Sequence, residues 1–349
     1  MALITKYGSQ FGTVPPTTGR VYFVAPSASY TVNGFSYPAS DDNDGLSPEK
    51  ALLTINRFVT LATADVGDTA ILLSGTHTVA STVRITKSGL TVLGVHGQHG
   101  RRNIWRLKSV ISAVAQSVAA ISVEANDTEI GYLEFRGDDA RSIMIFPNDT
   151  TNGVDGLYVH DCKFRLANVT VSTNNQMIDF SSRAPFSRLN ADGRGDFQLG
   201  SSAQLATAYL ENCLFESDGA HGPAINIATA AVHITGCRFH NQQGTWGIAV
   251  AVGTSADGCV IEHCSFTTGG TMGVPISGTT ADITGAVFVR YTDFGLPMTN
   301  NAIPIEDFTI GVNNAGEAMI GGGCYIMTAT GACAMYSTAT PSYGTTDIT

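Results

Sequence analysis

The feature of the sequence that most restricts its fold is a repeated pattern of eight residues. The pattern reads apolar, any, apolar, any two residues, a small residue or Cys, any residue, and Phe, with two departures, Thr128 and Leu133, in the first copy. Its six copies occupy residues 128–135, 157–164, 208–215, 232–239, 259–266 and 287–294, and their final Phe residues are 29, 51, 24, 27 and 28 positions apart. The 51-residue interval is either two periods or one unit that carries a long loop. Repetition at such a period indicates stacked structural units.

Each copy predicts two short strands joined by a bend. Apolar residues alternate with other residues, which is typical of strands that bury one face. In four copies the alternation breaks at a polar or Gly position: Asp161, Asn212, Gly236 and His263. Asp, Asn and Gly tolerate the left-handed backbone that a tight bend requires. A strand-only repeat of this kind suits a coil of parallel strands, and about eight coils between Ala70 and Phe294 would form a rod roughly 40 Å long.

The N-terminal part of the chain gives an independent indication of the same fold. It contains, in order, Val21–Val24, Ser40–Pro48, Ala51–Phe58, Val66–Leu73 and Ser74–Thr76. This order resembles the opening of right-handed parallel β-helix proteins of the pectate-lyase-like type, although Ala51 stands where those proteins typically have Pro. With the repeat, the resemblance covers about residues 20–294 and implies an all-β, right-handed parallel β-helix. Lyases, hydrolases, adhesins and phage spikes share this fold, so the resemblance alone implies no single function.

The sequence predicts three regions along the chain. Residues 1–20 form an N-terminal arm, residues 21–294 form the parallel β-helix, and residues 295–349 form a C-terminal cap or assembly segment. The last region contains no Lys or Arg and is rich in Gly, Ala and apolar residues. Small, uncharged side chains allow close backbone approach, so this segment is expected to finish the β-helix, to pack on another subunit, or to do both.

A capping helix is expected near residues 48–62. Ser47 is the expected N-cap, and Pro48 suits the first helical position because the missing N–H is not needed there. The apolar residues Leu52, Ile55, Phe58, Val59 and Ala62 would share one face of this helix. Such a helix would cover the otherwise exposed edge of the first coil.

Two columns of identical residues are expected inside the rod. Cys162, Cys213, Cys237 and Cys264 share one register of the repeat, and the final Phe residues share another. Stacked cysteines would stand in a row about 4.8 Å apart, and such a row does not converge on a tetrahedral zinc ion. Both columns are therefore interpreted as core, with Cys acting as a small apolar residue and Phe as an aromatic stack.

One acidic cluster precedes the expected capping helix. The run Asp41-Asp42-Asn43-Asp44-Gly45 is interpreted as a solvated turn. Calcium bound by Asp41, Asp42 and Asp44 is the alternative, because carboxylates suit a hard cation. The spacing does not match an EF-hand, since Ser40 would take the first ligand position if Gly45 were the sixth. No other cofactor is predicted.

No catalytic pair of carboxylates follows from the repeat. One outward column reads Gly131, His160, Glu211, Thr235, Glu262 and Arg290, and a second reads Glu134, Lys163, Leu214, Arg238, Ser265 and Asp293. Within each column no two neighbours are both acidic, whereas a glycosidase needs two carboxyl groups roughly 5–10 Å apart. The sequence therefore predicts a protein without enzymatic activity. If the chain is an enzyme, acids of the loops such as Asp138, Asp139 and Asp218 are the candidates.

Composition and the termini narrow the function classes. The chain has 19 basic and 29 acidic residues among 349, which argues against general nucleic-acid binding. Only 14% of residues are charged, yet no apolar run is long enough to span a membrane. The first residues do not read as a Sec signal, and seven cysteines, an odd number, fit a reducing compartment. Synthesis in a host cytoplasm without Sec export is expected.

These observations lead to one hypothesis and two alternatives. The hypothesis is a bacteriophage virion structural protein, a β-helical capsid-decoration, vertex or short spike protein that acts by assembly and surface binding. Its expected partners are other virion proteins, further copies of itself (a trimer is one candidate) and a glycan of the host surface. The first alternative is a polysaccharide depolymerase, a lyase or a glycoside hydrolase, on the same fold. The second is a bacterial surface adhesin.

Overall fold

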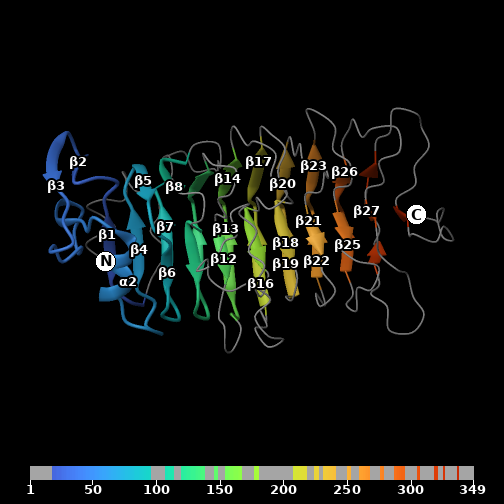
Figure 1. The fold of residues 1–349 in the computed structure, drawn as a ribbon, viewed down its shortest axis with the longest axis horizontal. Coiled ribbons are helices and arrows are strands. Elements are labelled where there is room, and N and C mark those ends of the chain that lie inside the picture. Colours follow the sequence, from blue (N-terminus) through green and yellow to red (C-terminus); the bar gives the residue numbers. More distant parts are fainter. Residues whose placement is uncertain are drawn as a thin grey trace, which may run out of the picture.

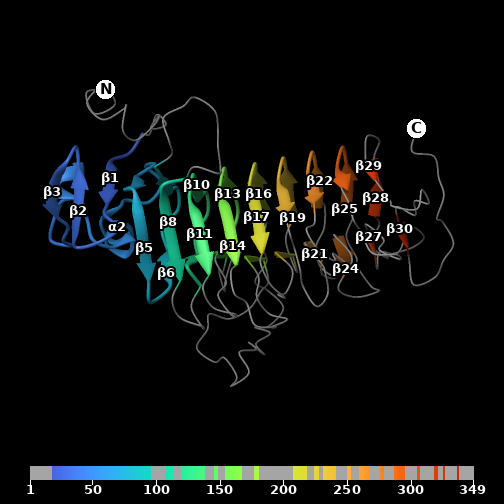
Figure 2. The ribbon, with the colours of Figure 1, turned by 90° about the horizontal axis from the view of Figure 1, so that it is seen from above.

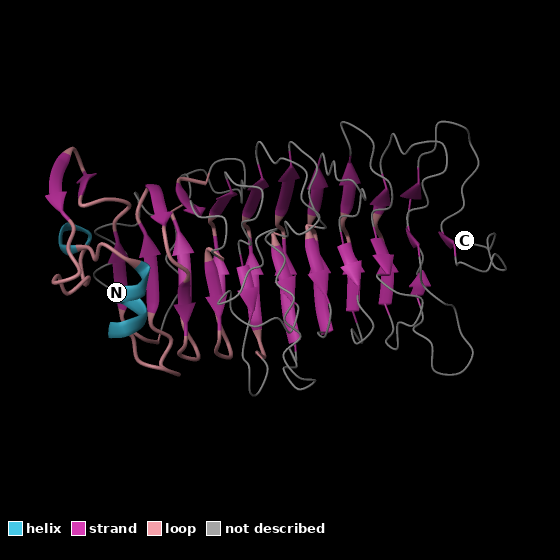
Figure 3. Ribbon diagram, viewed as in Figure 1, coloured by secondary structure: helices cyan, strands magenta, loops and turns pink. Residues whose placement is uncertain are grey.

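The computed structural model is a rod in which parallel strands wind into a helix (Figures 1 and 2). It describes residues 18–95, 107–113, 119–137, 145–147, 154–166, 177–180, 207–217, 224–227, 231–240, 250–252, 259–267, 276–278, 287–294, 305–306, 318–320, 325–326 and 336–337. Within the described residues, the first turn contributes only β1, and each later turn contributes one strand to each of three parallel sheets. Strands dominate the described residues, and the two short helices lie near the N-terminal end (Figure 3).

The three sheets contain ten, nine and nine strands. Sheet 1 consists of β1 (Val21–Val24), β4 (Thr69–Leu72), β7 (Thr91–Gly94), β10 (Glu129–Gly131), β13 (Leu157–His160), β16 (Thr207–Glu211), β19 (Ala231–Thr235), β22 (Cys259–Glu262), β25 (Val287–Arg290) and β28 (Ala318–Ile320). Sheet 2 consists of β5 (Gly75–Val79), β8 (Ser109–Ala113), β11 (Glu134–Gly137), β14 (Lys163–Leu166), β17 (Leu214–Ser217), β20 (Arg238–His240), β23 (Ser265–Thr267), β26 (Asp293–Phe294) and β29 (Tyr325–Ile326). Sheet 3 consists of β6 (Val83–Ile85), β9 (Ile121–Val123), β12 (Ile145–Pro147), β15 (Ile178–Phe180), β18 (Ile225–Ile227), β21 (Val250–Val252), β24 (Ile276–Gly278), β27 (Ile305–Glu306) and β30 (Tyr336–Ser337).

This topology confirms the predicted right-handed parallel β-helix. Every copy of the sequence repeat forms a strand of sheet 1, a bend and the following strand of sheet 2. The pairing is in register, so that Phe135 lies beside Phe164 and Phe164 lies beside Phe215. This last pairing also resolves the 51-residue interval. Strands β13 and β14 are direct neighbours of β16 and β17, and the interval is therefore one coil that carries a long insertion.

The predicted Phe column is a continuous aromatic stack. Phe135, Phe164, Phe215, Phe239 and Phe266 are all buried. Successive ring centroids lie 4.9, 4.9, 4.9 and 4.6 Å apart, and the ring planes differ by no more than 8°. The spacing follows the distance between coils, because each ring is fixed to a strand that pairs with the next. The column is thus core, as the sequence predicted.

The Cys column lies beside the Phe column and is also buried. Cys162, Cys213, Cys237 and Cys264 are free thiols. Each Sγ donates to a backbone carbonyl of the preceding coil, at sulfur–oxygen distances of 3.8, 3.7, 3.7 and 3.5 Å. Burial raises the pKa of the thiols of Cys213, Cys237 and Cys264 well above its ordinary value. These thiols therefore remain protonated and act as small core residues, as interpreted from the repeat.

The bends between sheets 1 and 2 use the left-handed backbone that the sequence indicated. Asp161, Asn212, Gly236 and His263 all have positive φ, between 50° and 64°, and Tyr132 and Tyr291 occupy the equivalent bends of flanking coils. In the five bends from Tyr132 to His263 the amide donates to a carbonyl of the next coil, for example from Asn212 to Thr235 and from Gly236 to Glu262. The bends are therefore hydrogen-bonded into the stack like the strands themselves.

The capping helix is shorter than predicted and begins later. Pro48–Lys50 forms only a 3₁₀ turn, η1, and the helix α2 spans Ile55–Leu61. The N-cap is Thr54, whose hydroxyl accepts from the amide of Arg57, whereas the Ser47 side chain makes no capping hydrogen bond. The reason is that Leu52 is extended and bridges Val24 of the first strand, so it closes the open edge of sheet 1 as a strand would. Ile55, Phe58 and Val59 do bury one face of α2.

A second, smaller core covers the outer face of the first coils of sheet 1. The antiparallel hairpin of β2 (Ser29–Val32) and β3 (Phe35–Pro38) folds over this end of the rod. Tyr30 and Val32 of the hairpin belong to one hydrophobic cluster with the outward side chains of Phe23, Ile71 and Leu93. Tyr132 packs against this cluster from the following coil. The outer wall of sheet 1 is therefore apolar and covered at the N-terminal end, and it becomes polar from β10 onwards.

The sheets continue beyond Phe294 into the segment expected to cap or assemble. Strands β28, β29 and β30 pair in register with β25, β26 and β27. The described strands of residues 295–349 thus extend the same coil, and the assembly role of this segment stays a prediction. Of the expected arm, Thr18, Gly19 and Arg20 are described, and the amide of Arg20 donates to Asp68.

Loss of one ring from the Phe stack should destabilise the rod strongly. Phe215→Ala removes a fully buried ring between two stacked neighbours and leaves a cavity that the coils cannot close. We expect its free energy of unfolding in urea to fall by about 3–5 kcal/mol. The control is Phe35→Ala, whose ring is 67% exposed, and its effect should stay within about 0.5 kcal/mol. Equal effects of the two substitutions would contradict the stacked core.

Candidate functional site

Polar and aromatic side chains gather on the outer wall of sheet 1. The wall has two columns, and the pairing of the strands fixes the order of both. One runs through Glu129, Tyr158, Tyr209, His233 and Val260, and the other through Gly131, His160, Glu211, Thr235, Glu262 and Arg290. The second is the column read from the sequence, and its stacking is confirmed. Among the described residues, this wall is the best candidate for a functional surface.

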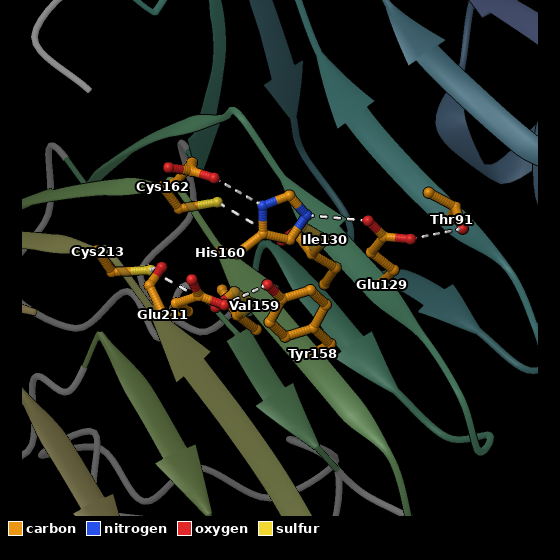
Figure 4. A network of polar contacts seen from close by, with 10 residues as sticks. Thr91, Glu129, Ile130, Tyr158, Val159, His160, Cys162, Glu211 and Cys213 are labelled. Atoms are coloured by element: carbon orange, nitrogen blue, oxygen red, sulfur yellow. Dashed lines mark hydrogen bonds and ion pairs between the residues drawn. The ribbon is translucent and has the colours of Figure 1, made fainter. Parts of the chain in front are cut away.

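His160 lies at the centre of a network of charged groups (Figure 4). Its Nε2 is 2.9 Å from Oε1 of Glu129, and its Nδ1 is 3.0 Å from Oδ2 of Asp161. The second oxygen of Glu129 accepts from the hydroxyl of Thr91 at 3.3 Å. As an imidazolium, His160 donates to both carboxylates at once, which is the arrangement of a fixed cation between two anions.

The surroundings of His160 hold its ring in one place. The ring stacks on Tyr158 with centroids 4.6 Å apart and meets Tyr132 edge-on at 5.1 Å. A Cβ at Gly131 would approach the Cε1 and Nε2 atoms of His160 to 2.5 Å. A side chain at Gly131 would therefore displace the imidazole. Only 6% of His160 is exposed, although its column faces outward.

The charges of this network shift the pKa values of its members. Burial by itself lowers the pKa of His160, but the hydrogen bonds and charges of Asp161 and Glu129 outweigh it and raise the pKa to about 9. The hydrogen bond from His160 in turn holds the pKa of Glu129 below its ordinary value, although burial opposes this. At neutral pH His160 is therefore protonated, and it does not act as a general base.

Tyr158 links this network to the next coil. Its hydroxyl donates to Oε2 of Glu211 at 2.6 Å. Burial and this bond to a carboxylate raise the pKa of Tyr158 well above its ordinary value. The side-chain amide of Asn212 also donates to Oε1 of Glu211 at 3.3 Å. Further along the wall, Nε of Arg290 lies 2.6 Å from Oε2 of Glu262.

A shallow groove of about 150 Å³ opens between these pairs. It crosses β13, β16, β19 and β22, so it runs along the axis of the rod. The side chains of its lining that carry polar groups are Tyr158, Tyr209, Glu211, His233, Thr235 and Glu262. The ring of Tyr209 is exposed and lies 5.3 Å from that of His233. The groove thus combines an accessible aromatic face with hydrogen-bond acceptors.

The acidic turn near the N-terminus has a structural role. Asp41 accepts from the amides of Leu53 and Thr54 through Oδ1 and from the Thr54 hydroxyl through Oδ2. Asp44 accepts from the amide of Leu46, and Asp42 shares a hydrogen bond with Ser40. These contacts fit the interpretation of the run as a turn, and calcium bound by Asp41, Asp42 and Asp44 stays the alternative prediction. In the described part of the chain, no group of three or more His, Cys, Asp or Glu side chains is arranged to hold a metal ion.

The other candidate residues fall into two groups. Asp138, Asp139 and Asp218 lie outside the described residues. The second outward column stacks as expected from Glu134 to Asp293, but Leu214 and Glu134 are buried, so this column is not a uniformly exposed wall. Here Lys163 pairs with Glu216 at 2.7 Å, and Arg136 pairs with Glu134 at 2.8 Å.

The contact between His160 and Glu129 was missed in the sequence. The two residues belong to different outward columns, and the repeat relates residues only within one column. The signal was nevertheless present, because Glu129 stands two positions before Gly131, and a missing side chain at Gly131 leaves room for a ring from the next coil. A search for diagonal pairs beside each outward Gly would have found it.

Comparison with known proteins gives remote structural likenesses only. No protein-family model and no curated protein matches the chain. The solved structure of pectin methylesterase from Aspergillus niger is 12% identical, with 96% of this chain and 93% of that chain covered and a TM-score of 0.45. The ORF18 protein of Geobacillus virus E2 is 11% identical, with 78% of this chain and 58% of that chain covered and a TM-score of 0.36. The catalytic unit of the GH87 α-1,3-glucanase from Streptomyces thermodiastaticus is 10% identical, with 77% of this chain and 65% of that chain covered and a TM-score of 0.25.

These values give no ground for assigning the activity of any of the three proteins to this chain. What its own topology defines is the class, a right-handed parallel β-helix. Among the described residues, no helix has the length and apolar character needed to cross a lipid bilayer.

The His160 network should make stability depend on pH in a defined direction. The folded-state pKa of about 9 lies above the ordinary value of His, so the network stabilises the fold fully below about pH 6.5, and this contribution is lost as pH rises through about 9. We expect the difference in free energy of unfolding between the wild type and His160→Gln to be largest near pH 6 and to shrink by about pH 9.5.

The partner of His160 supplies the control for this measurement. In a Glu129→Gln background, the effect of His160→Gln should vary less with pH, because one of the two anions that hold the imidazolium is gone. A difference between wild type and His160→Gln that is the same at both ends of the range would contradict the network.

Proposed function

We propose that this chain is a structural protein of a bacteriophage virion, a β-helical capsid-decoration, vertex or short spike protein that acts by assembly and surface binding. The observation that carries the proposal is the mutual pairing of the charged groups on the outer wall of sheet 1. His160 is held between Glu129 and Asp161, Glu211 accepts from Tyr158, and Glu262 pairs with Arg290. Groups fixed in this way serve a stiff surface better than a proton-transfer reaction.

The rod itself supports a mechanical role. Adjacent coils are joined by strand pairing in all three sheets, by hydrogen-bonded bends and by the Phe stack. Bending the rod would separate these contacts on one side, and close-packed cores resist such separation. A stiff body of this kind suits an appendage that holds a binding surface away from a particle.

The last coil of the described chain supports assembly. Strands β28, β29 and β30 each pair with a neighbour on one side only within the described residues. The surrounding segment, residues 295–349, contains no Lys or Arg. A parallel edge of low charge is prone to pair or pack with another chain. We therefore place contacts to other virion proteins, or to further copies of this chain, at this end, with a trimer as one candidate.

The proposal predicts both self-association and presence on particles. In sedimentation-velocity ultracentrifugation the purified protein should be oligomeric. In density gradients it should comigrate with the phage particles of its source, and electron microscopy should show it bound at the capsid or the tail. A protein that stays monomeric at high concentration and never comigrates with particles would overturn the proposal.

A second candidate function, a polysaccharide depolymerase, rests on a different observation. Glu211 and Glu262 face the same groove with Thr235 between them, so their backbones are two coils, or about 10 Å, apart. Inverting glycoside hydrolases separate their carboxyl groups by roughly 6.5–9.5 Å. Both carboxylates, however, accept bonds from side chains of the wall, so neither is free of a partner to act as an acid.

Activity assays distinguish the two candidates. We expect no new reducing ends and no unsaturated uronates after incubation with bacterial capsular or algal polysaccharides. Activity that disappears in both Glu211→Gln and Glu262→Gln would establish the depolymerase instead. Activity lost in Asp138→Asn, Asp139→Asn or Asp218→Asn would place that site in the loops.

A further inference from the structure

We propose that the groove on the outer wall of sheet 1 binds a neutral sugar ring of a glycan chain. The inference deepens the proposed function, because it names the class of ligand that the virion protein would bind at a surface. It depends on four features of the groove: its dimensions, its aromatic face, its acceptors and its charge.

The dimensions of the groove fit a small ring that belongs to a longer chain. Its volume of about 150 Å³ is below the range of about 300–1,000 Å³ for sites that enclose a whole drug-sized ligand. It crosses four strands from β13 to β22, a length of about 14 Å, and runs along the rod. A polymer could therefore place one ring in the groove and continue along the wall.

The aromatic face is supplied by Tyr209. Its residue is 44% exposed, which is unusual for a ring that lies in the middle of a stacked sheet. The tilted contact with His233 supports the ring on one side and limits its rotation. An exposed aromatic ring held in this way offers a flat apolar surface to the C–H groups of a sugar, and it loses little side-chain entropy when the sugar binds.

The acceptors lie on the opposite column of the same groove. Glu211 and Glu262 project from alternate coils, and the hydroxyl-bearing Thr235 stands between them. A carboxylate has about four acceptor positions, so the bond from Arg290 leaves acceptor capacity on Glu262 for further hydroxyl groups. Sugar hydroxyls donate well to such carboxylates, and bonds of this kind are stronger than those between neutral groups.

The charge of the groove selects against acidic sugars. Glu211 and Glu262 line it, whereas Glu129 lies outside it and is bound to the protonated His160, and Arg290 is bound to Glu262. The whole chain carries a formal net charge of −10. A uronate or another anionic sugar would meet like charges at short range, whereas a neutral ring would not. The ligand is therefore a neutral glycan rather than an acidic one.

Saturation-transfer difference NMR on the full-length protein tests the inference. The probes are glucose, galactose, mannose, rhamnose and N-acetylglucosamine as neutral sugars, with galacturonate as the acidic comparison. At least one neutral sugar should show saturation transfer from the wild type, and galacturonate should show none. The absence of transfer to all neutral sugars would overturn the inference.

Two substitutions locate the binding in the groove. Tyr209→Ala removes the aromatic face and Glu262→Gln weakens an acceptor, and each should raise the dissociation constant by about tenfold. The control Phe35→Ala removes an exposed ring on the β2–β3 hairpin and should leave binding unchanged. Circular dichroism and melting curves confirm that each variant folds. Transfer that persists unchanged in both groove variants would also overturn the inference.

The same variants separate this inference from the proposed function. Neither Tyr209 nor Glu262 lies in the last described coil, so both variants should still form oligomers and comigrate with particles. A protein that assembles on particles but binds no neutral sugar would refute only the inference that the groove binds a sugar. A protein that binds sugar through Tyr209 but never joins a particle would refute only the virion function.

Discussion

The structure depends on in-register parallel pairing between successive coils. This pairing fixes the distance between coils at about 4.8 Å, and it places equivalent residues of the repeat directly above one another. Phe164, Phe215 and Phe239 consequently stack at the coil spacing, and the cysteines form a parallel column beside them. A residue that fits one coil must therefore also fit its two neighbours. This requirement explains why the same few residue types recur along the chain.

The outer wall is built on the same in-register pairing, but its side-chain contacts differ from those of the core. Its side chains are less constrained in size, and contacts form diagonally between columns as well as along them. His160 reaches Glu129 over the bare Cα of Gly131, and Tyr158 reaches Glu211 of the next coil. The first contact pairs opposite charges, and the second gives a partly buried carboxylate a hydrogen-bond donor. The wall that results has carboxylates on one side of an open groove and an aromatic column on the other.

The fold was predictable to the level of strands, bends and core columns, because each of these rests on a local pattern repeated many times. The details of the N-terminal cap were not. Pro48 and the apolar spacing of the following residues favour a helix there, yet Leu52 is extended because the unpaired edge of β1 competes for its backbone groups. The site was predictable only in part: the column of His160 and Glu211 was read correctly, whereas the diagonal partner of His160 was not.

The sequence by itself therefore determined the period, the left-handed bends and the identity of the buried columns. Alternation and bend residues act over a few positions, and stacking then repeats their outcome in every coil. Only the tertiary structure decided that the 51-residue interval is one coil, that the β2–β3 hairpin joins the cluster of Phe23 and Leu93, and which wall residues meet. These outcomes depend on which strand lies next and on what covers each face. Both are contacts between segments far apart in the chain, and no local pattern encodes them.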